Sequence, residues 1–162
     1  MIAYLGLGSN LGDRLQQLRK AVTALSKRLS TICVCSSVYE SSPWGYTEQP
    51  DFLNLVVSVR VGMDPWQLLE VCHQVESDLG RRARPRWHER EIDIDILLAG
   101  SLTLREPQLT IPHPALRERD FVLVPLLEVE PHLVDPQNGR PLSDYLSKTP
   151  ALKLYHEGAL AC

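Results

Sequence analysis

The sequence predicts an α+β fold in which an antiparallel sheet carries its helices on one face. Short segments rich in apolar and β-branched residues, which are typical of strands, alternate with two segments that have the apolar periodicity of amphipathic helices. The predicted elements follow one another as strand, helix, strand, strand, helix and strand, and a C-terminal extension follows. This βαββαβ order is the ferredoxin-like pattern.

A glycine-rich turn joins the first strand to the first helix. Ile2 to Leu7 is a short apolar run, and the glycines that follow are spaced one residue too far apart for a dinucleotide-binding turn. The turn therefore indicates a change from strand to helix, with Asn10 or Asp13 as the helix cap. The helix is expected over residues 13–29, with apolar positions at Leu15, Leu18, Val22, Leu25 and Leu29.

Two strands are expected next in the chain. Thr31 to Tyr39 is rich in β-branched residues, and Phe52 to Val61 has a continuous apolar face made by its odd-numbered residues. Phe52 and Asn54 share the opposite face of the latter strand. A partly exposed strand under a helix would explain this pair. A planar ligand that stacks on the ring and bonds to the carboxamide would explain it equally well.

The second helix has clear boundaries in the sequence. Asp64 is a suitable N-cap, Pro65 suits the first helical position, and Gly80 follows the last turn. Glu76 lies in the last turn, where its negative charge opposes the helix dipole. A nearby arginine, or a ligand hydroxyl or amine, would favour the charge there.

The strand that follows this helix carries two aspartates. Because side chains alternate along a strand, Asp93 and Asp95 share one face with Leu97, opposite a core face made by Ile92, Ile94, Ile96 and Leu98. Residues two positions apart on a strand have α-carbons about 6.6 Å apart. That spacing suits a pair of magnesium ions, which lie about 3.5–4 Å apart in two-metal phosphoryl-transfer sites.

An arginine-rich loop leads directly into the acidic strand. Five of the thirteen arginines lie between Arg81 and Arg90, and the planar guanidinium fork suits phosphate oxygens. A solvated strand face or a surface loop would explain either feature alone. Together they predict a site for magnesium and polyphosphate, because adjacent carboxylates repel unless a cation compensates them.

The rest of the chain offers fewer signals. His113 lies between two prolines that restrict its backbone, which suits a structural or a functional histidine. Phe121 to Leu127 predicts a further strand, and a short helix is expected over Leu142 to Lys148. Since neither a repeat nor a linker interrupts the sequence, we expect one domain over residues 1–162.

Composition narrows the classes of partner. The formal net charge is −3, so nucleic acid is not expected as a partner, and no apolar run approaches the 18 residues of a membrane span. Met1 leads directly into a strand, which predicts a cytoplasmic protein without a signal peptide. The four cysteines lack metal-binding spacing and are expected to be reduced and mostly buried.

Four stretches in order resemble the 6-hydroxymethyl-7,8-dihydropterin pyrophosphokinase family. They are YLGLGSNLGDR, YESSPWGYTEQPDFLN, RWHEREIDIDIL and IPHPALRERDFVLVPL, and the resemblance runs from about Ala3 to Leu146. It implies an enzyme of folate biosynthesis that transfers pyrophosphate from ATP to the pterin hydroxymethyl group and releases AMP. It also implies two Mg²⁺ ions, ATP as co-substrate and a monomeric protein without membrane partners.

The resemblance also implies roles for single residues. Asp93 and Asp95 would bind the magnesium ions, and Arg81, Arg90 and Asp95 would be catalytic. The implied ATP-binding residues are Glu76, Arg81, Trp87, Arg90, Ile96, His113 and Arg119, and the implied pterin-binding residues are Gly8, Ser42, Pro43, Trp44, Phe52, Asn54 and Phe121.

The chain departs from the family pattern at a few positions. His88 and Glu89 stand where Gly-Pro is usual, which places a further negative charge near the phosphate path. Ala83 stands where a second arginine is common, which leaves Arg82 or Arg84 as possible substitutes. No acidic ligand is lost.

Two other functions fit parts of the pattern. An RNA-binding module on the same sheet would need a basic sheet face with central aromatics, which the two aspartates disfavour. A kinase or a nucleotidyltransferase with the same metal site would differ in its products. Pyrophosphoryl transfer releases AMP, kinase chemistry releases ADP, and nucleotidyl transfer releases pyrophosphate.

Overall fold

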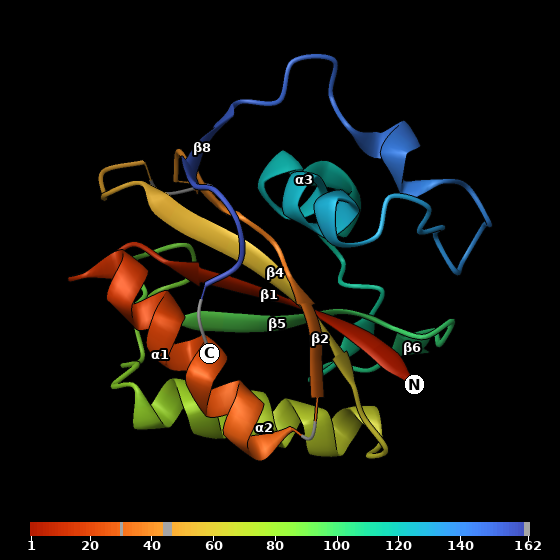
Figure 1. The fold of residues 1–162 in the computed structure, drawn as a ribbon, viewed down its shortest axis with the longest axis horizontal. Helices are drawn as coiled ribbons and strands as arrows, with labels where there is room; N and C mark the ends of the chain where they lie inside the picture. Colours follow the sequence, from red (N-terminus) through yellow and green to blue (C-terminus); the bar gives the residue numbers. More distant parts are fainter. Residues whose placement is uncertain (30, 44–46, 161–162) are drawn as a thin grey trace.

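An antiparallel sheet is the middle layer of the protein, whose computed structural model describes residues 1–29, 31–43 and 47–160. Its strands lie in the order β5 (Asp93–Ala99), β1 (Ile2–Ser9), β4 (Phe52–Arg60), β3 (Val38–Ser41) and β8 (Leu152–His156), and β2 (Thr31–Cys35) also pairs with β4 (Figure 1). Each of these pairings is antiparallel. The predicted fold class is confirmed.

Helices α1 (Arg14–Arg28) and α2 (Pro65–Asp78) cover one face of this sheet (Figure 1). Asp13 caps α1 by accepting a hydrogen bond from the Gln16 amide at 3.1 Å. Asp64 and Gln67 form a capping box at the start of α2, with Pro65 at its first position. The buried core of the molecule lies between these helices and the sheet. Both helices are close to their predicted bounds.

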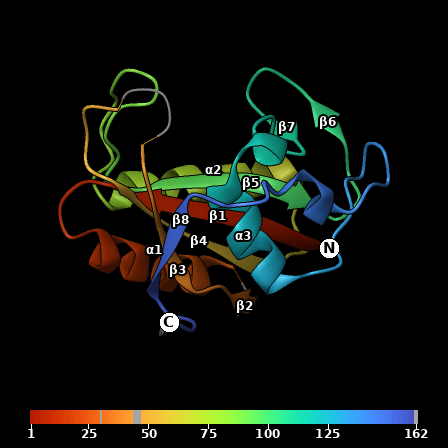
Figure 2. The same cartoon turned by 90° about the horizontal axis from the view of Figure 1, so that it is seen from above.

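A third helix, α3 (Asp120–Val129), lies on the opposite face of the sheet (Figures 1 and 2). The predicted strand from Phe121 to Leu127 is therefore wrong. Leu123 and Leu126 are fully buried and belong to a second apolar cluster with Val56 and Leu97 of the sheet. Burial of residues three apart stabilises a helix here, which outweighs the β-branched valines and the internal proline.

Two strand predictions also need correction. The segment from Thr31 to Tyr39 forms two strands, because Ser36 and Ser37 interrupt it: the Ser36 hydroxyl accepts a hydrogen bond from the Val56 amide at 2.9 Å. In β5, the register with β1 shifts so that Leu5 faces Ile96 and Tyr4 faces Leu98. This bulge turns Leu98 to the α3 side of the sheet, away from the predicted core face.

Short elements precede and follow α3 in the C-terminal extension. Before α3 come β6 (Leu104–Arg105), β7 (Thr110–Ile111) and the 3-10 turn Leu116–Glu118; after it come the 3-10 turn Leu142–Tyr145, which contacts α3, and β8, which pairs with β3. The predicted helix at Leu142 is only that second 3-10 turn, and β8 was not predicted. Of the described cysteines only Cys72 is buried, so the expectation of mostly buried thiols is wrong. In the part of the chain that is described, no helix has the length and apolarity to cross a membrane.

Candidate active site

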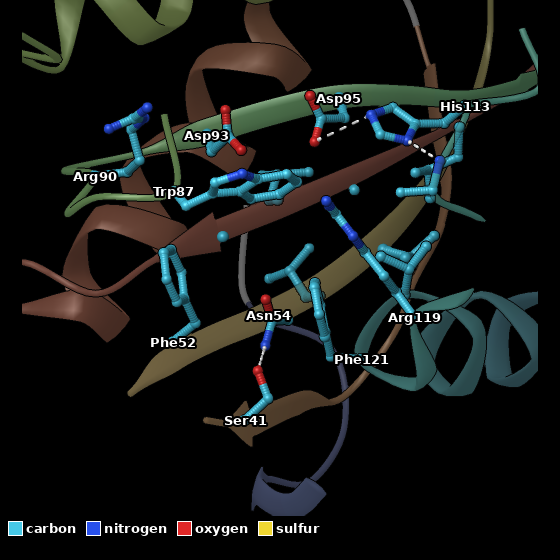
Figure 3. A pocket seen from close by; sticks show the side chains of 18 of the residues that line it. Ser41, Phe52, Asn54, Trp87, Arg90, Asp93, Asp95, His113, Arg119 and Phe121 are labelled. Carbon is cyan, nitrogen blue, oxygen red and sulfur yellow. Dashed lines mark hydrogen bonds and ion pairs between the residues drawn. The ribbon is translucent and has the colours of Figure 1, made fainter. Parts of the chain in front are cut away.

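A cavity of about 360 Å³ opens on the α3 side of the sheet, beside the part that α3 covers (Figure 3). Strands β1, β4 and β5 form its floor, and its walls come from the arginine-rich loop, the segment around His113 and the start of α3. The predicted aromatic, amide and acidic residues therefore meet in one place, although they come from separate parts of the sequence.

Two glycines of the central strand keep the floor of this cavity open. Gly8 pairs with Asn54 of β4 on one side and with Asp93 of β5 on the other. Gly6 pairs with Val56 of β4 on one side and with Asp95 of β5 on the other. A β-carbon at Gly8 would lie 3.4 Å from the Asn54 Oδ1 atom and 3.6 Å from the Phe52 ring, so a side chain here would fill the floor.

The β4 side of the cavity carries rings and an amide. Asn54 is buried, and its Nδ2 donates a 2.8 Å hydrogen bond to the Ser41 hydroxyl of β3. Phe52 and Phe121 flank Asn54 (Figure 3). With one amide hydrogen held by Ser41, the carboxamide is fixed in orientation while its oxygen lies next to Gly8. This arrangement suits a flat heterocycle that carries both donors and acceptors.

The β5 side of the cavity carries the two aspartates. Asp93 accepts a 3.0 Å hydrogen bond from the Arg81 guanidinium, and Asp95 lies 3.9 Å from the Nε2 atom of His113. Burial, together with the neighbouring charges of Asp93 and Glu76, raises the pKa of Asp95 well above its ordinary value. The pair therefore favours a cation, which would relieve the repulsion between the carboxylates.

His113 is held by hydrogen bonds to β5 and to the loop that follows the histidine. Its amide donates to the Leu97 carbonyl at 3.0 Å, and its Nδ1 atom accepts from the Ala115 amide at 3.2 Å. Burial, aided by the charge of Arg119, lowers the pKa of His113 to about 4. The imidazole is therefore neutral at pH 7 with its hydrogen on Nε2, which points to Asp95 as a donor.

Glu76 lies behind β5 and does not line the cavity. Its Oε2 atom accepts a 2.8 Å hydrogen bond from the Ile94 amide and forms an ion pair with Arg81. Burial raises the pKa of Glu76 to about 7, although the Ile94 bond and the Arg81 charge act in the opposite direction. Arg81 is therefore the nearby arginine that the sequence allowed as a partner of Glu76. It also donates a hydrogen bond to Asp93. Glu76 thus positions Arg81 and β5 together.

The arginine-rich loop is held by the buried Asn10, which was predicted only as a possible helix cap. Asn10 accepts from the Arg90 amide at 2.8 Å and donates to the Gln49 side chain at 2.7 Å. Gln49 in turn donates to the Trp87 carbonyl. The arginine-rich loop and the loop before Phe52 are therefore joined through one residue at the end of β1.

Trp87 reaches into the cavity from that loop (Figure 3). The guanidinium carbons of Arg86 and Arg119 lie 4.5 and 4.8 Å from the centre of its ring, so two cations contact the indole. Arg84 forms a 2.5 Å ion pair with Glu91 within the loop. Of the two residues that could replace an arginine at Ala83, Arg84 is thus already held by a partner.

Most of the predicted site residues line the cavity. They are Gly8, Ser42, Phe52, Asn54, Arg81, Trp87, Arg90, Asp93, Asp95, His113, Arg119 and Phe121. Pro43 does not line it, and Trp44 lies outside the described residues. Ile96 points into the core on the α1 and α2 side, so its side chain cannot contact a ligand in the cavity.

Residues of the site and its supports that were not predicted include Gly6, Ser41, Asn10, Gln49 and Arg86. Ser41 could have been predicted, because it directly precedes Ser42, which the resemblance assigned to the pterin site. The signal for Asn10 and Gln49 is weaker, since nothing local in the sequence shows that two loops 39 residues apart meet.

The donors at β5 suit magnesium. Among the described residues, no group of three or more His, Cys, Asp and Glu side chains could hold a metal ion. Magnesium is commonly bound by one or two carboxylates together with substrate phosphates and water, and it does not need a closed protein cage. Asp93 and Asp95 provide such an incomplete set beside a cluster of arginines.

Comparisons with known proteins show the family of this chain. Residues 4–131 match the family model described as 7,8-dihydro-6-hydroxymethylpterin-pyrophosphokinase (HPPK). The 2-amino-4-hydroxy-6-hydroxymethyldihydropteridine pyrophosphokinase of Aquifex aeolicus is 44% identical over 142 residues, which are 88% of this chain and 88% of that protein. The Bacillus subtilis protein of the same name is 45% identical over 129 residues, covering 79% of this chain and 77% of the relative.

A solved structure shows the same fold at lower identity. The HPPK-DHPS of Plasmodium falciparum superposes with a TM-score of 0.70 and 19% identity over 89% of this chain. The chain spans 44% of the length of that larger protein, so the likeness concerns one part of it.

Proposed function

We propose that this chain, which belongs to the 7,8-dihydro-6-hydroxymethylpterin-pyrophosphokinase family, transfers pyrophosphate from ATP to the hydroxymethyl group of 6-hydroxymethyl-7,8-dihydropterin in folate biosynthesis. The observation that carries the proposal is the division of one cavity into two halves. Rings and an amide lie on β4, and carboxylates and arginines lie on and beside β5.

The pterin would occupy the β4 half of the cavity. Its flat ring system would stack between Phe52 and Phe121, and Asn54 would bond to its edge. Ser41 would hold the Asn54 amide in the orientation that this bond needs. Gly8 would leave room for the ring above β1. Ser42, Pro43 and Trp44 remain predicted contacts of the pterin through their backbone groups.

ATP would lie across the β5 half of the cavity. Arg81, Arg90 and Arg119 would contact its phosphates, and His113 would donate from Nε2 to a phosphate oxygen. Trp87 would border ATP from the loop, whereas Glu76 would act through Arg81. For Ile96, only a backbone contact with the nucleoside is compatible with its buried side chain.

Two magnesium ions would be held by Asp93 and Asp95 together with the ATP phosphates. When bound, they neutralise phosphate charge and orient the reacting groups. The pterin hydroxymethyl oxygen would attack the β-phosphorus of ATP in line with the leaving AMP. Asp95 would assist that hydroxyl, because its carboxylate would lie between the metal ions and the acceptor. The chain would act as a monomer in the cytoplasm.

Product analysis tests this function directly. We expect the protein to convert ATP and 6-hydroxymethyl-7,8-dihydropterin into equal amounts of AMP and pyrophosphorylated pterin, and we expect EDTA to abolish the reaction. Release of ADP would indicate a kinase, and release of pyrophosphate would indicate a nucleotidyltransferase. Either product in place of AMP would overturn the proposal.

Replacing Gly8 by alanine is expected to raise the KM for the pterin about tenfold and to leave the affinity for MgATP within twofold. A methyl group in a fitted pocket changes binding by about this much, and the new β-carbon would contact Asn54 and Phe52 without a severe clash. Steady-state kinetics with each substrate varied in turn would measure both effects.

Gly62 provides a matched control for this variant, because a β-carbon added there has nothing within 4 Å. Gly62→Ala should therefore leave both KM values unchanged. An equal loss of affinity for MgATP and for the pterin in Gly8→Ala would contradict the assignment of Gly8 to the pterin half.

A further inference from the structure

The C-terminal strand β8 lies beyond residue 131, where the match to the family model ends, and forms the edge of the sheet next to β3 (Figure 2). Its register places Leu152 opposite Ser41 and Leu154 opposite Tyr39. Two further contacts hold the tail: the Gly158 amide donates to the Ser37 hydroxyl at 2.9 Å, and Leu160 is buried in the core.

Arg14 connects this strand to β3 and to the segment before β4. Its guanidinium donates to the Glu40 carboxylate at 2.7 Å and to the Asp51 carbonyl at 2.9 Å. The same guanidinium lies 5.5 Å from the centre of the Tyr155 ring of β8. One side chain at the first position of α1 therefore contacts β3, the segment before β4 and the C-terminal strand.

The two partners of Arg14 immediately precede two residues of the cavity. Glu40 precedes Ser41, Asp51 precedes Phe52, and Ser41 and Phe52 pair with each other across β3 and β4. Ser41 holds the Asn54 amide, and Phe52 provides one of the two rings. A displacement of Glu40 relative to Asp51 would therefore alter the ring and the amide together.

Arg14 is not needed to form α1. The helix is capped by Asp13, and its buried residues Leu18, Val22 and Leu25 hold it on the sheet. The Arg14 and Glu40 side chains are 22% and 26% exposed, and partly exposed ion pairs contribute little to stability. The orientation of the Arg14 guanidinium toward β3 and β4 thus calls for another explanation.

We propose that Arg14 is a positioning residue for the pterin half of the cavity, and that Tyr155 of the C-terminal strand holds it in place. This inference rests on the proposed function, since it assigns the β4 half to the pterin. Arg14 sets the relation of β3 to β4 and does not touch the substrate. The C-terminal strand thereby contributes to substrate affinity from outside the cavity.

Kinetics of Arg14→Met test the proposal. We expect the KM for the pterin to rise about tenfold, because the Phe52 ring and the Asn54 amide would lose the geometry that pterin binding needs, with kcat and the KM for MgATP within twofold of the parent values. The thermal midpoint should change by less than about 2 °C, because the ion pair is partly exposed. Tyr155→Leu should raise the KM for the pterin two- to threefold, and Tyr155→Phe, which keeps the ring, should not.

Arg28→Met is the matched control at the other end of the same helix. Arg28 forms a 2.5 Å ion pair with Asp78 and does not line the cavity. This variant should leave both KM values unchanged. The proposal is overturned if Arg14→Met leaves the KM for the pterin unchanged, lowers affinity for both substrates alike, or behaves as Arg28→Met does. Failure of the parent protein to form AMP would instead overturn the proposed function, and this inference with it.

Discussion

Asp95→Asn is expected to lower the rate of AMP formation by at least about a thousandfold while the protein stays folded. The amide keeps the shape of the carboxylate but loses the charge that would hold magnesium, and it cannot take up the hydroxyl proton. Loss of one preorganised electrostatic contact typically costs a factor of about 10²–10³ in kcat, and here two roles are lost together. Single-turnover formation of AMP would measure the effect.

The same substitution is expected to leave stability unchanged or to increase it when metal is removed by EDTA. Asp95 is buried beside Asp93, and its pKa is raised in the folded protein above the ordinary value of 3.8. The folded state therefore binds more protons than the unfolded state, so stability falls as the pH rises from about 3.8 through the raised pKa of Asp95. Because asparagine does not titrate, the variant should not lose stability in this way as the pH rises. Urea unfolding at pH 5 and pH 8 would show a smaller pH dependence in the variant.

Either of two results would contradict the role assigned to Asp95. One is that Asp95→Asn retains more than a tenth of the parental kcat at saturating magnesium. The other is that it unfolds at lower urea concentrations than the parent protein in EDTA, which would mean that the charge stabilises the fold and is not held there for function.

Asp135→Asn is expected to have the opposite effect, with activity kept and stability lost. Asp135 is fully buried in the C-terminal extension and accepts two hydrogen bonds from Arg117, at 2.5 and 2.9 Å. The Gln137 amide and the Tyr145 hydroxyl also donate to it. An amide would point two hydrogens at donors, so we expect the free energy of unfolding to fall by about 3 kcal/mol, as for other broken buried pairs.

The pH dependence gives a second measurement on Asp135. The hydrogen bonds from Arg117 lower the pKa of Asp135 to about 2, against 3.8 for an ordinary aspartate. Its contribution of about 2 kcal/mol is therefore present above pH 3.8 and is lost as the pH falls to about 2. Acid unfolding of Asp135→Asn should lack this component, since asparagine does not titrate.

Asp144 is the matched control for this variant. It lies in the same extension, is exposed and is 3.7 Å from Arg140. Asp144→Asn should change the free energy of unfolding by less than about 0.5 kcal/mol, as is usual at the surface. Comparable destabilisation in both variants would show that the extension tolerates no loss of charge, and that the burial of Asp135 has no special importance.

Local signals predicted much of the fold correctly. Asp64, Pro65 and Gly80 define the second helix because capping and backbone preferences act over a few residues. Asp93 and Asp95 share a face because strand periodicity alone decides it. The helix α3 was missed because its sequence favours a strand locally, whereas burial of Leu123 and Leu126 against the sheet favours a helix.

The connections between distant parts of the chain could not be predicted in this way. The bulge near Leu97 depends on the partner strand, and the hydrogen bonds of Asn10 depend on where two loops meet. Five of the predicted residues that line the cavity lie on strands, whose side-chain directions follow from the sequence: Gly8, Phe52, Asn54, Asp93 and Asp95. Apart from the arginines before β5, the predicted residues on loops came from the resemblance to the family. Residues on loops, such as Arg86 and Gln49, became apparent only in three dimensions.

The glycines of β1 have a consequence for how accurately the two substrates can be aligned. Asn54 and Asp93 pair with the same residue, Gly8, from opposite sides, so they are separated by two strand spacings, or about 9.6 Å. Backbone hydrogen bonds of the sheet fix this separation, and no loop takes part in it. Changes in the loops should therefore alter how fast and how tightly substrates bind, while the distance between acceptor and phosphate stays constant. The sheet thus fixes the distance between the β4 half and the β5 half of the cavity.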